Sequence, residues 1–77
     1  MKAEIYSKPN CKFCVAAKEL LERRGIEYVE LQAPDHLETL MERIDAAGQP
    51  RPRTVPQIFL DGAYIGGYDR LAEQLGA

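Results

Sequence analysis

The alternation of apolar and polar residues changes period along this chain, and the period separates strands from helices. Lys2–Tyr6 sets apolar residues among polar ones and predicts a first strand. From about residue 12 to residue 24, apolar residues recur at helical spacing, and Gly25 suits the position just after a helix end. Ser7-Lys8-Pro9-Asn10 predicts a turn between them, with Asn10 or Cys11 capping the helix.

A second strand and a second helix follow. Ile26–Leu31 has the length and content of a strand, and Ala33-Pro34 interrupts it. We expect Asp35 to begin the helix, because Glu38 three residues later resembles a capping box. Gly48 ends this helix, whose apolar stripe should pack on a sheet and comprises Leu37, Leu40, Met41 and Ile44.

The last third of the chain predicts a hairpin and a short helix. Val55–Leu60 and Ala63–Gly66 flank Asp61-Gly62, a strong two-residue hairpin signal. Beyond Gly66-Gly67 and Asp69, Leu71 and Leu75 lie four residues apart on a final helix. The element order is β-α-β-α-β-β-α, and the crossover rule makes the first two strands parallel. We therefore predict an α/β fold: a mixed four-stranded sheet flanked by three helices, in one domain spanning residues 1–77.

Composition narrows the function classes. A net charge of −2 gives no basic surface for nucleic acid, and no apolar run approaches the length of a membrane span. No signal-peptide apolar segment follows Met1, so we expect a cytoplasmic location. Pro50-Arg51-Pro52-Arg53 predicts a solvated loop.

The only two cysteines carry the candidate chemistry, in the segment Cys11-Lys12-Phe13-Cys14. A C-x-x-C pair between a strand and a helix is typical of thiol–disulfide exchange. At a helix start, unpaired backbone N–H groups and the positive end of the dipole stabilise the thiolate of Cys11. Cys14, one turn later, can close a short disulfide and should be the less exposed sulfur.

Two other readings of the pair stay open at this point. A zinc site needs four ligands, whereas the chain offers Cys11, Cys14 and a single His36, so we predict no metal. A purely structural disulfide is disfavoured because so short a loop removes little entropy from the unfolded chain.

The segment Tyr6–Cys14, taken with two later motifs, resembles the glutaredoxins of the thioredoxin-like superfamily. Thr54-Val55-Pro56 looks like the family's Thr-Val-Pro element, and Gly66-Gly67-Tyr68-Asp69 looks like its Gly-Gly-x-Asp element. The resemblance covers nearly the whole chain. It implies a thioredoxin-like fold and a monomer.

The resemblance also implies an activity: glutathione-dependent reduction of protein disulfides and glutathione mixed disulfides. Cys11 would be the nucleophile, Cys14 the resolving thiol and glutathione the co-substrate. Ribonucleotide reductase is a partner that small glutaredoxins often supply with electrons. Within the family pattern, Pro56 is cis, and the Val55 backbone lies beside the cysteines to pair with a peptide-like substrate.

The glutathione site implied by the resemblance falls on named positions. Lys8 would attract a glutathione carboxylate, while the γ-glutamyl carboxylate meets the last helix and its ammonium group meets Asp69. Under a structural reading, Lys8 is a solvated lysine and Asp69 caps the helix. The expected glutathione-binding residues are Lys8, Cys11, Phe13, Thr54, Val55, Pro56, Gly67, Tyr68 and Asp69.

The chain departs from the family pattern at four positions. Lys12 and Phe13 replace a frequent proline and tyrosine, Tyr68 replaces a small residue, and Arg70 stands where a second acidic residue is common. Lys12 and Arg70 keep open an electron donor recharged by thioredoxin reductase, although the Thr-Val-Pro segment and Asp69 favour glutathione. The family also keeps open a non-catalytic iron–sulfur carrier. Carriers usually lack the second cysteine, so Cys14 argues against this alternative.

Overall fold

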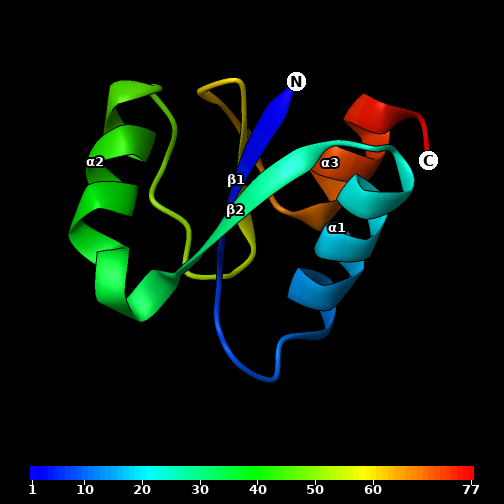
Figure 1. Ribbon diagram of the computed structural model, residues 1–77. Helices are drawn as coiled ribbons and strands as arrows, with labels where there is room; N and C mark the ends of the chain where they lie inside the picture. Colours follow the sequence, from blue (N-terminus) through cyan, green and yellow to red (C-terminus); the bar gives the residue numbers. More distant parts are fainter.

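A mixed four-stranded sheet forms the centre of the molecule, with helices on both faces (Figure 1). The computed structural model describes residues 1–77. The strands are β1 (Lys2–Ser7), β2 (Glu27–Gln32), β3 (Gln57–Leu60) and β4 (Ala63–Gly66), and they lie in the order β2-β1-β3-β4. β1 pairs parallel with β2 and antiparallel with β3, and β3 pairs antiparallel with β4. This is the predicted thioredoxin-like arrangement.

Three α-helices and one 3₁₀ turn complete the chain. They are α1 (Lys12–Arg23), the 3₁₀ turn η1 (Ala33–His36), α2 (Leu37–Ala46) and α3 (Tyr68–Leu75). In Figure 1, α2 covers one face of the sheet, and α1 and α3 lie together on the other. None of these helices has the length and apolar character needed to cross a bilayer.

Strand alternation divides the buried residues between the two faces. Ile5 and Ile58 point toward α1 and α3, whereas Tyr6 and Phe59, their neighbours in sequence, point toward α2. The α1/α3 core also includes Leu20, Leu21 and Leu71, and the α2 core includes Leu40 and Ile44.

Most predicted boundaries are confirmed within one or two residues. Cys11 caps α1, and Gly25 follows its end with a positive φ of 68°. Asp61 and Gly62 both have positive φ, as the tight turn between β3 and β4 requires. β3 begins at Gln57 and not at the predicted Val55, because Pro56 has no N–H to donate to a neighbouring strand.

Three predictions about helix starts and faces were wrong. Pro34 opens the 3₁₀ turn η1, so α2 begins at Leu37 and the capping box expected from Asp35 does not form. Leu37 is 53% exposed, because it lies at the first turn of α2, outside the buried part of the stripe. Asp69 does not cap α3: the cap position is Gly67, and Asp69 lies inside the first turn.

Candidate active site

Cys11 and Cys14 form a disulfide at the junction of the β1–α1 loop and α1. Cys11 has extended backbone angles at the cap position, which turns its side chain back toward the start of the helix. The N–H of Cys14 donates to Cys11 Sγ over 3.2 Å. A negative charge on Cys11 after reduction is therefore stabilised by this N–H and by the positive end of the helix.

The two sulfurs differ in access to solvent. Cys14 is 2% exposed on the buried side of α1, whereas Cys11 is partly exposed at the surface. The expectation that Cys14 is the less exposed sulfur is confirmed. Cys11 is therefore the sulfur of the pair that an external disulfide can reach.

The segment before β3 lies beside the disulfide. The Val55–Pro56 peptide bond is cis, as the resemblance implied. The carbonyl oxygen of Val55 lies 3.7 Å from Cys11 Sγ. Val55 precedes β3 and has no strand partner, so its backbone is placed to pair with an extended chain next to the reacting sulfur.

One groove runs from this segment to the start of α3, and we call it the Val55 groove. Its volume is about 420 Å³, within the range of roughly 300–1,000 Å³ that is usual for small-molecule sites. The rings of Phe13 and Tyr68 form one wall, with centroids 5.9 Å apart. The lining residues are Phe13, Thr54, Val55, Pro56, Gly67, Tyr68, Asp69 and Arg70.

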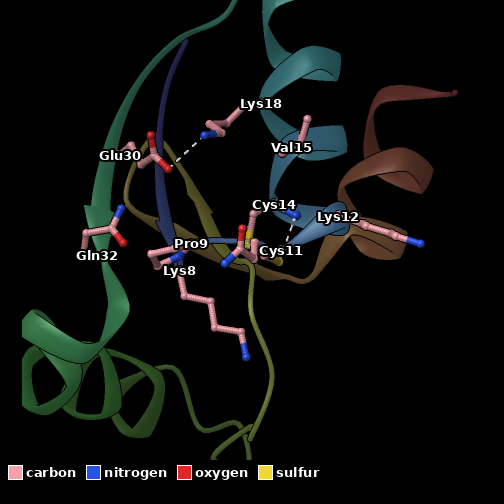
Figure 2. Close-up of a pocket in the computed structure, with 10 residues that line it drawn as sticks. Lys8, Pro9, Cys11, Lys12, Cys14, Val15, Lys18, Glu30 and Gln32 are labelled. Carbon is pink, nitrogen blue, oxygen red and sulfur yellow. Dashed lines mark hydrogen bonds and ion pairs between the residues drawn. A yellow bond between two sulfur atoms is a disulfide. The ribbon is translucent and has the colours of Figure 1, made fainter.

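A second groove lies on the other side of the cysteine pair, and we call it the lysine groove (Figure 2). Lys8, Lys12 and Lys18 line it together with both cysteines. Figure 2 shows Lys18 directed at Glu30, whereas Lys8 and Lys12 extend in different directions from the cysteine pair. Asn10, Val15 and Gln32 also line this groove and were not predicted, since only the packing of β2 beside α1 brings these segments together.

Glu30 is the acidic group of the lysine groove. The buried hydroxyl of Ser7 donates to Glu30 Oε2, and Lys18 Nζ lies 3.0 Å from the same oxygen. These two hydrogen bonds, that of Ser7 first, hold the pKa of Glu30 below its ordinary value. Glu30 is therefore charged at neutral pH, and it pairs with Lys18. Lys8 and Lys12, the lysines closest to the cysteines in sequence, form no ion pair.

The structure divides the predicted glutathione-binding residues between the two grooves. The Val55 groove brings together Phe13, Thr54, Val55, Pro56, Gly67, Tyr68 and Asp69. Lys8 and Cys11 line the lysine groove. Arg70 also lines the Val55 groove, although it was noted only as a departure from the family pattern. Its position next to Asp69, in the first turn of α3, was the available signal. No three His, Cys, Asp or Glu side chains gather as ligands for a metal ion.

Comparisons with known proteins agree with this geometry. The glutaredoxin family model matches residues 3–65. Glutaredoxin 3 of Escherichia coli K12 is 41% identical over 68 residues, which cover 88% of this chain and 78% of that protein.

Solved structures show the same fold. Reduced Escherichia coli glutaredoxin matches with a TM-score of 0.74 and 34% identity, over 99% of this chain and 94% of that one. A buckwheat glutaredoxin–glutathione complex matches with a TM-score of 0.75 and 28% identity, over 96% of this chain and 67% of that one. The chain therefore belongs to the glutaredoxin family and is a thiol–disulfide oxidoreductase with Cys11 and Cys14 as its redox pair.

Proposed function

We propose that this oxidoreductase takes its electrons from glutathione and reduces protein disulfides and glutathione mixed disulfides. The observation that carries the proposal is the position of Val55, whose carbonyl oxygen lies 3.7 Å from Cys11 Sγ at one end of the Val55 groove. Glutathione is a tripeptide with a thiol in the middle. A thiol held at Cys11 therefore places the rest of the tripeptide along this groove.

The far end of the groove supplies the polar partners for such a ligand. The first backbone N–H groups of α3 are free to bind the γ-glutamyl carboxylate, since no side chain caps this helix. Asp69 is exposed in the first turn of α3, where its carboxylate would pair with the ammonium group. The complex of buckwheat glutaredoxin with glutathione supports this choice of ligand.

Two exchange routes follow from the different exposure of the cysteines. In the first, the Cys11 thiolate attacks the glutathione sulfur of a mixed disulfide, and the substrate leaves as a thiolate that takes a proton from water. A second glutathione thiolate attacks the bound glutathione sulfur, which releases glutathione disulfide and restores Cys11.

The second route acts on protein disulfides. Cys11 attacks one substrate sulfur and forms a mixed disulfide, and the other substrate sulfur leaves as a thiolate. Cys14 then attacks the Cys11 sulfur, which releases the reduced substrate and forms the Cys11–Cys14 disulfide. Two glutathione molecules reduce this disulfide in turn and leave as glutathione disulfide. The protein thus returns to its starting state.

We further propose that the chain works as a single-domain monomer in the cytoplasm and that ribonucleotide reductase is among its substrates. The family supports these assignments by analogy. Purified reductase with its disulfide formed is the direct substrate to test.

A coupled assay tests the reductant. Turnover of a small disulfide is followed by NADPH consumption, with glutathione plus glutathione reductase in one arm and thioredoxin reductase in the other. We expect turnover in the glutathione arm only. Turnover with thioredoxin reductase alone would keep Cys11 as the nucleophile and overturn the glutathione assignment. No turnover in either arm, with visible absorbance after anaerobic purification, would favour the iron–sulfur carrier.

A further inference from the structure

Arg70 carries a charge with no partner beside the Val55 groove. It is exposed in the first turn of α3, and the three ion pairs of the structure join other residues. The stem of Arg70 passes close over Gly66, where an added Cβ would lie 3.3 Å from Arg70 Cγ. Gly66 therefore leaves room for the stem, and Arg70 lines the groove with a guanidinium group that makes no hydrogen bond or ion pair within the protein.

A third groove, which we call the Arg70 groove, continues from the Val55 groove. The two grooves share Thr54, Gly67 and Arg70, and the Arg70 groove extends from them past Gln57 and Tyr64 to Gln49. Its volume is about 400 Å³. A chain that leaves the Val55 groove at Thr54 and Gly67 therefore enters the Arg70 groove next.

The polar wall of the Arg70 groove is already ordered. Gln57 is 3% exposed, donates from Nε2 to the Thr54 carbonyl oxygen over 2.8 Å and accepts from the Tyr64 hydroxyl. These bonds fix the wall before any ligand arrives, which lowers the entropy lost on binding. Arg70 is the only charged residue that lines the groove.

We propose that the Arg70 groove binds an acidic side chain of the disulfide substrate, whose carboxylate pairs with Arg70. A peptide substrate rather than a free anion fits because the groove is continuous with the one beside Cys11. A guanidinium group presents its donors in a fork that matches a carboxylate. Protein disulfides with Asp or Glu near the attacked cysteine are then the preferred substrates. The proposal rests on the proposed function only in that Cys11 is the nucleophile toward peptide disulfides.

The test uses single turnover of the prereduced protein, so that glutathione is not needed. The substrates are peptides with one internal disulfide and a Glu, Gln or Lys at two, four or six residues from one cysteine. At one spacing, we expect the Glu peptide to react about three- to tenfold faster than its Gln twin at low salt, and the preference to shrink at high salt.

Variants that remove or reverse the charge of Arg70 distinguish binding at this residue from a general effect of the protein's net charge. Arg70→Gln should remove the preference for the Glu peptide, and Arg70→Glu should shift it to the Lys peptide. Arg53→Gln changes charge equally in a neighbouring loop but lies outside both grooves, so it should keep the wild-type Glu/Gln ratio.

The outcomes are distinguishable. Equal rates for Glu and Gln peptides at every spacing, in a wild-type protein that still reduces them, would overturn the Arg70 site and leave the redox function intact. A preference that survives Arg70→Glu would also overturn it. No reaction with any peptide would overturn this inference, whereas failure only in the glutathione-coupled assay would overturn the glutathione assignment.

Discussion

At the scale of single residues, the difference in exposure between Cys11 and Cys14 predicts which thiol attacks the substrate and which one resolves the mixed disulfide. Cys11→Ser should abolish turnover of every disulfide, because the only other thiol, that of Cys14, is buried. Cys14→Ser should keep turnover of glutathione mixed disulfides and lose most reduction of protein disulfides, since the intermediate is no longer resolved from within. Parallel assays with a glutathionylated peptide and a disulfide-bonded protein measure both. Activity that survives without Cys11 would contradict the assignment.

The second residue-scale prediction concerns Glu30 and pH. The folded-state pKa of Glu30 lies below its ordinary value of 4.5, so this carboxylate stabilises the fold above that pH. The stabilisation is lost as the pH falls through the lowered pKa. Ser7→Ala removes the largest cause and should raise the pKa of Glu30 in an NMR titration. It should also reduce the stability advantage of pH 7 over acidic pH.

The matched control for this prediction is Lys18→Gln, which removes the second hydrogen bond to Glu30. It should also raise the pKa of Glu30, because Lys18 lowers that pKa both through its hydrogen bond and through its charge. If Ser7→Ala left the titration of Glu30 unchanged, the hydrogen bond from the buried hydroxyl would not be the cause of the shift.

Site residues close in sequence to the cysteines were predictable from the sequence. Residues that are distant in sequence, and that strand pairing places near the cysteines, were not. The C-x-x-C spacing identifies Cys11 and Cys14, because both lie on one helical turn. The contact of Ser7 with Glu30 depends on the register between β1 and β2, which no local pattern encodes. The family resemblance filled part of this gap by placing Val55 near Cys11.

At the scale of elements, one arginine adds polar contacts between α2 and the sheet to those of the apolar α2 core. Arg43 donates two hydrogen bonds to Glu4 and one to the Tyr6 hydroxyl. Its guanidinium also lies 3.8 Å from the centroid of the Phe59 ring. These hydrogen bonds, those to Glu4 foremost, raise the pKa of Arg43, so the charge persists at any working pH.

Arg43→Lys should therefore destabilise the fold although it keeps the charge. A lysine cannot make the forked bond to Glu4 or stack flat on Phe59, and we expect a loss of about 1 kcal/mol in urea unfolding. The control is Arg51→Lys, because the ion pair of Arg51 with Asp45 is exposed. It should cause no measurable change. Equal effects of both variants would contradict the role given to Arg43.

The start of α2 shows where patterns of sequence are weakest. Asp35 and Glu38 have capping-box spacing, yet Pro34 favours the 3₁₀ turn, and the α-helix starts at Leu37. Periodicity located the helix and its inner residues Leu40 and Ile44, because burial of an apolar stripe depends on period alone. The first turn depends instead on the path of the preceding loop.

At the scale of the whole molecule, the sheet separates two hydrophobic cores, which support different parts of the molecule. The α1/α3 core lies behind α3 and Tyr68, whereas the α2 core lies on the opposite face of the sheet and touches the Val55 groove only through Val55. Leu71→Ala and Leu40→Ala remove equal, buried side chains, one from each core. Each should cost about 2–5 kcal/mol of stability, as large-to-small core substitutions do.

Their effects on catalysis should differ. Leu71→Ala loosens α3 and should raise KM for a glutathionylated peptide, because α3 carries Tyr68, Asp69 and Arg70. Leu40→Ala should raise KM less, because the α2 core contacts the groove only through Val55, when both variants are assayed at a temperature where circular dichroism shows them folded. An equal rise in KM for both variants would contradict this difference between the two cores.

The burial of Cys14 also sets the order of events in time. With only one cysteine sulfur at the surface, we expect every electron pair to enter and leave the protein through Cys11. The disulfide substrate and the reductant therefore cannot react with the protein at the same time; one must dissociate before the other reacts. The two half-reactions therefore alternate at one sulfur, as in a ping-pong mechanism. Double-reciprocal plots of rate against the concentration of one reactant, at several fixed concentrations of the other, should give parallel lines.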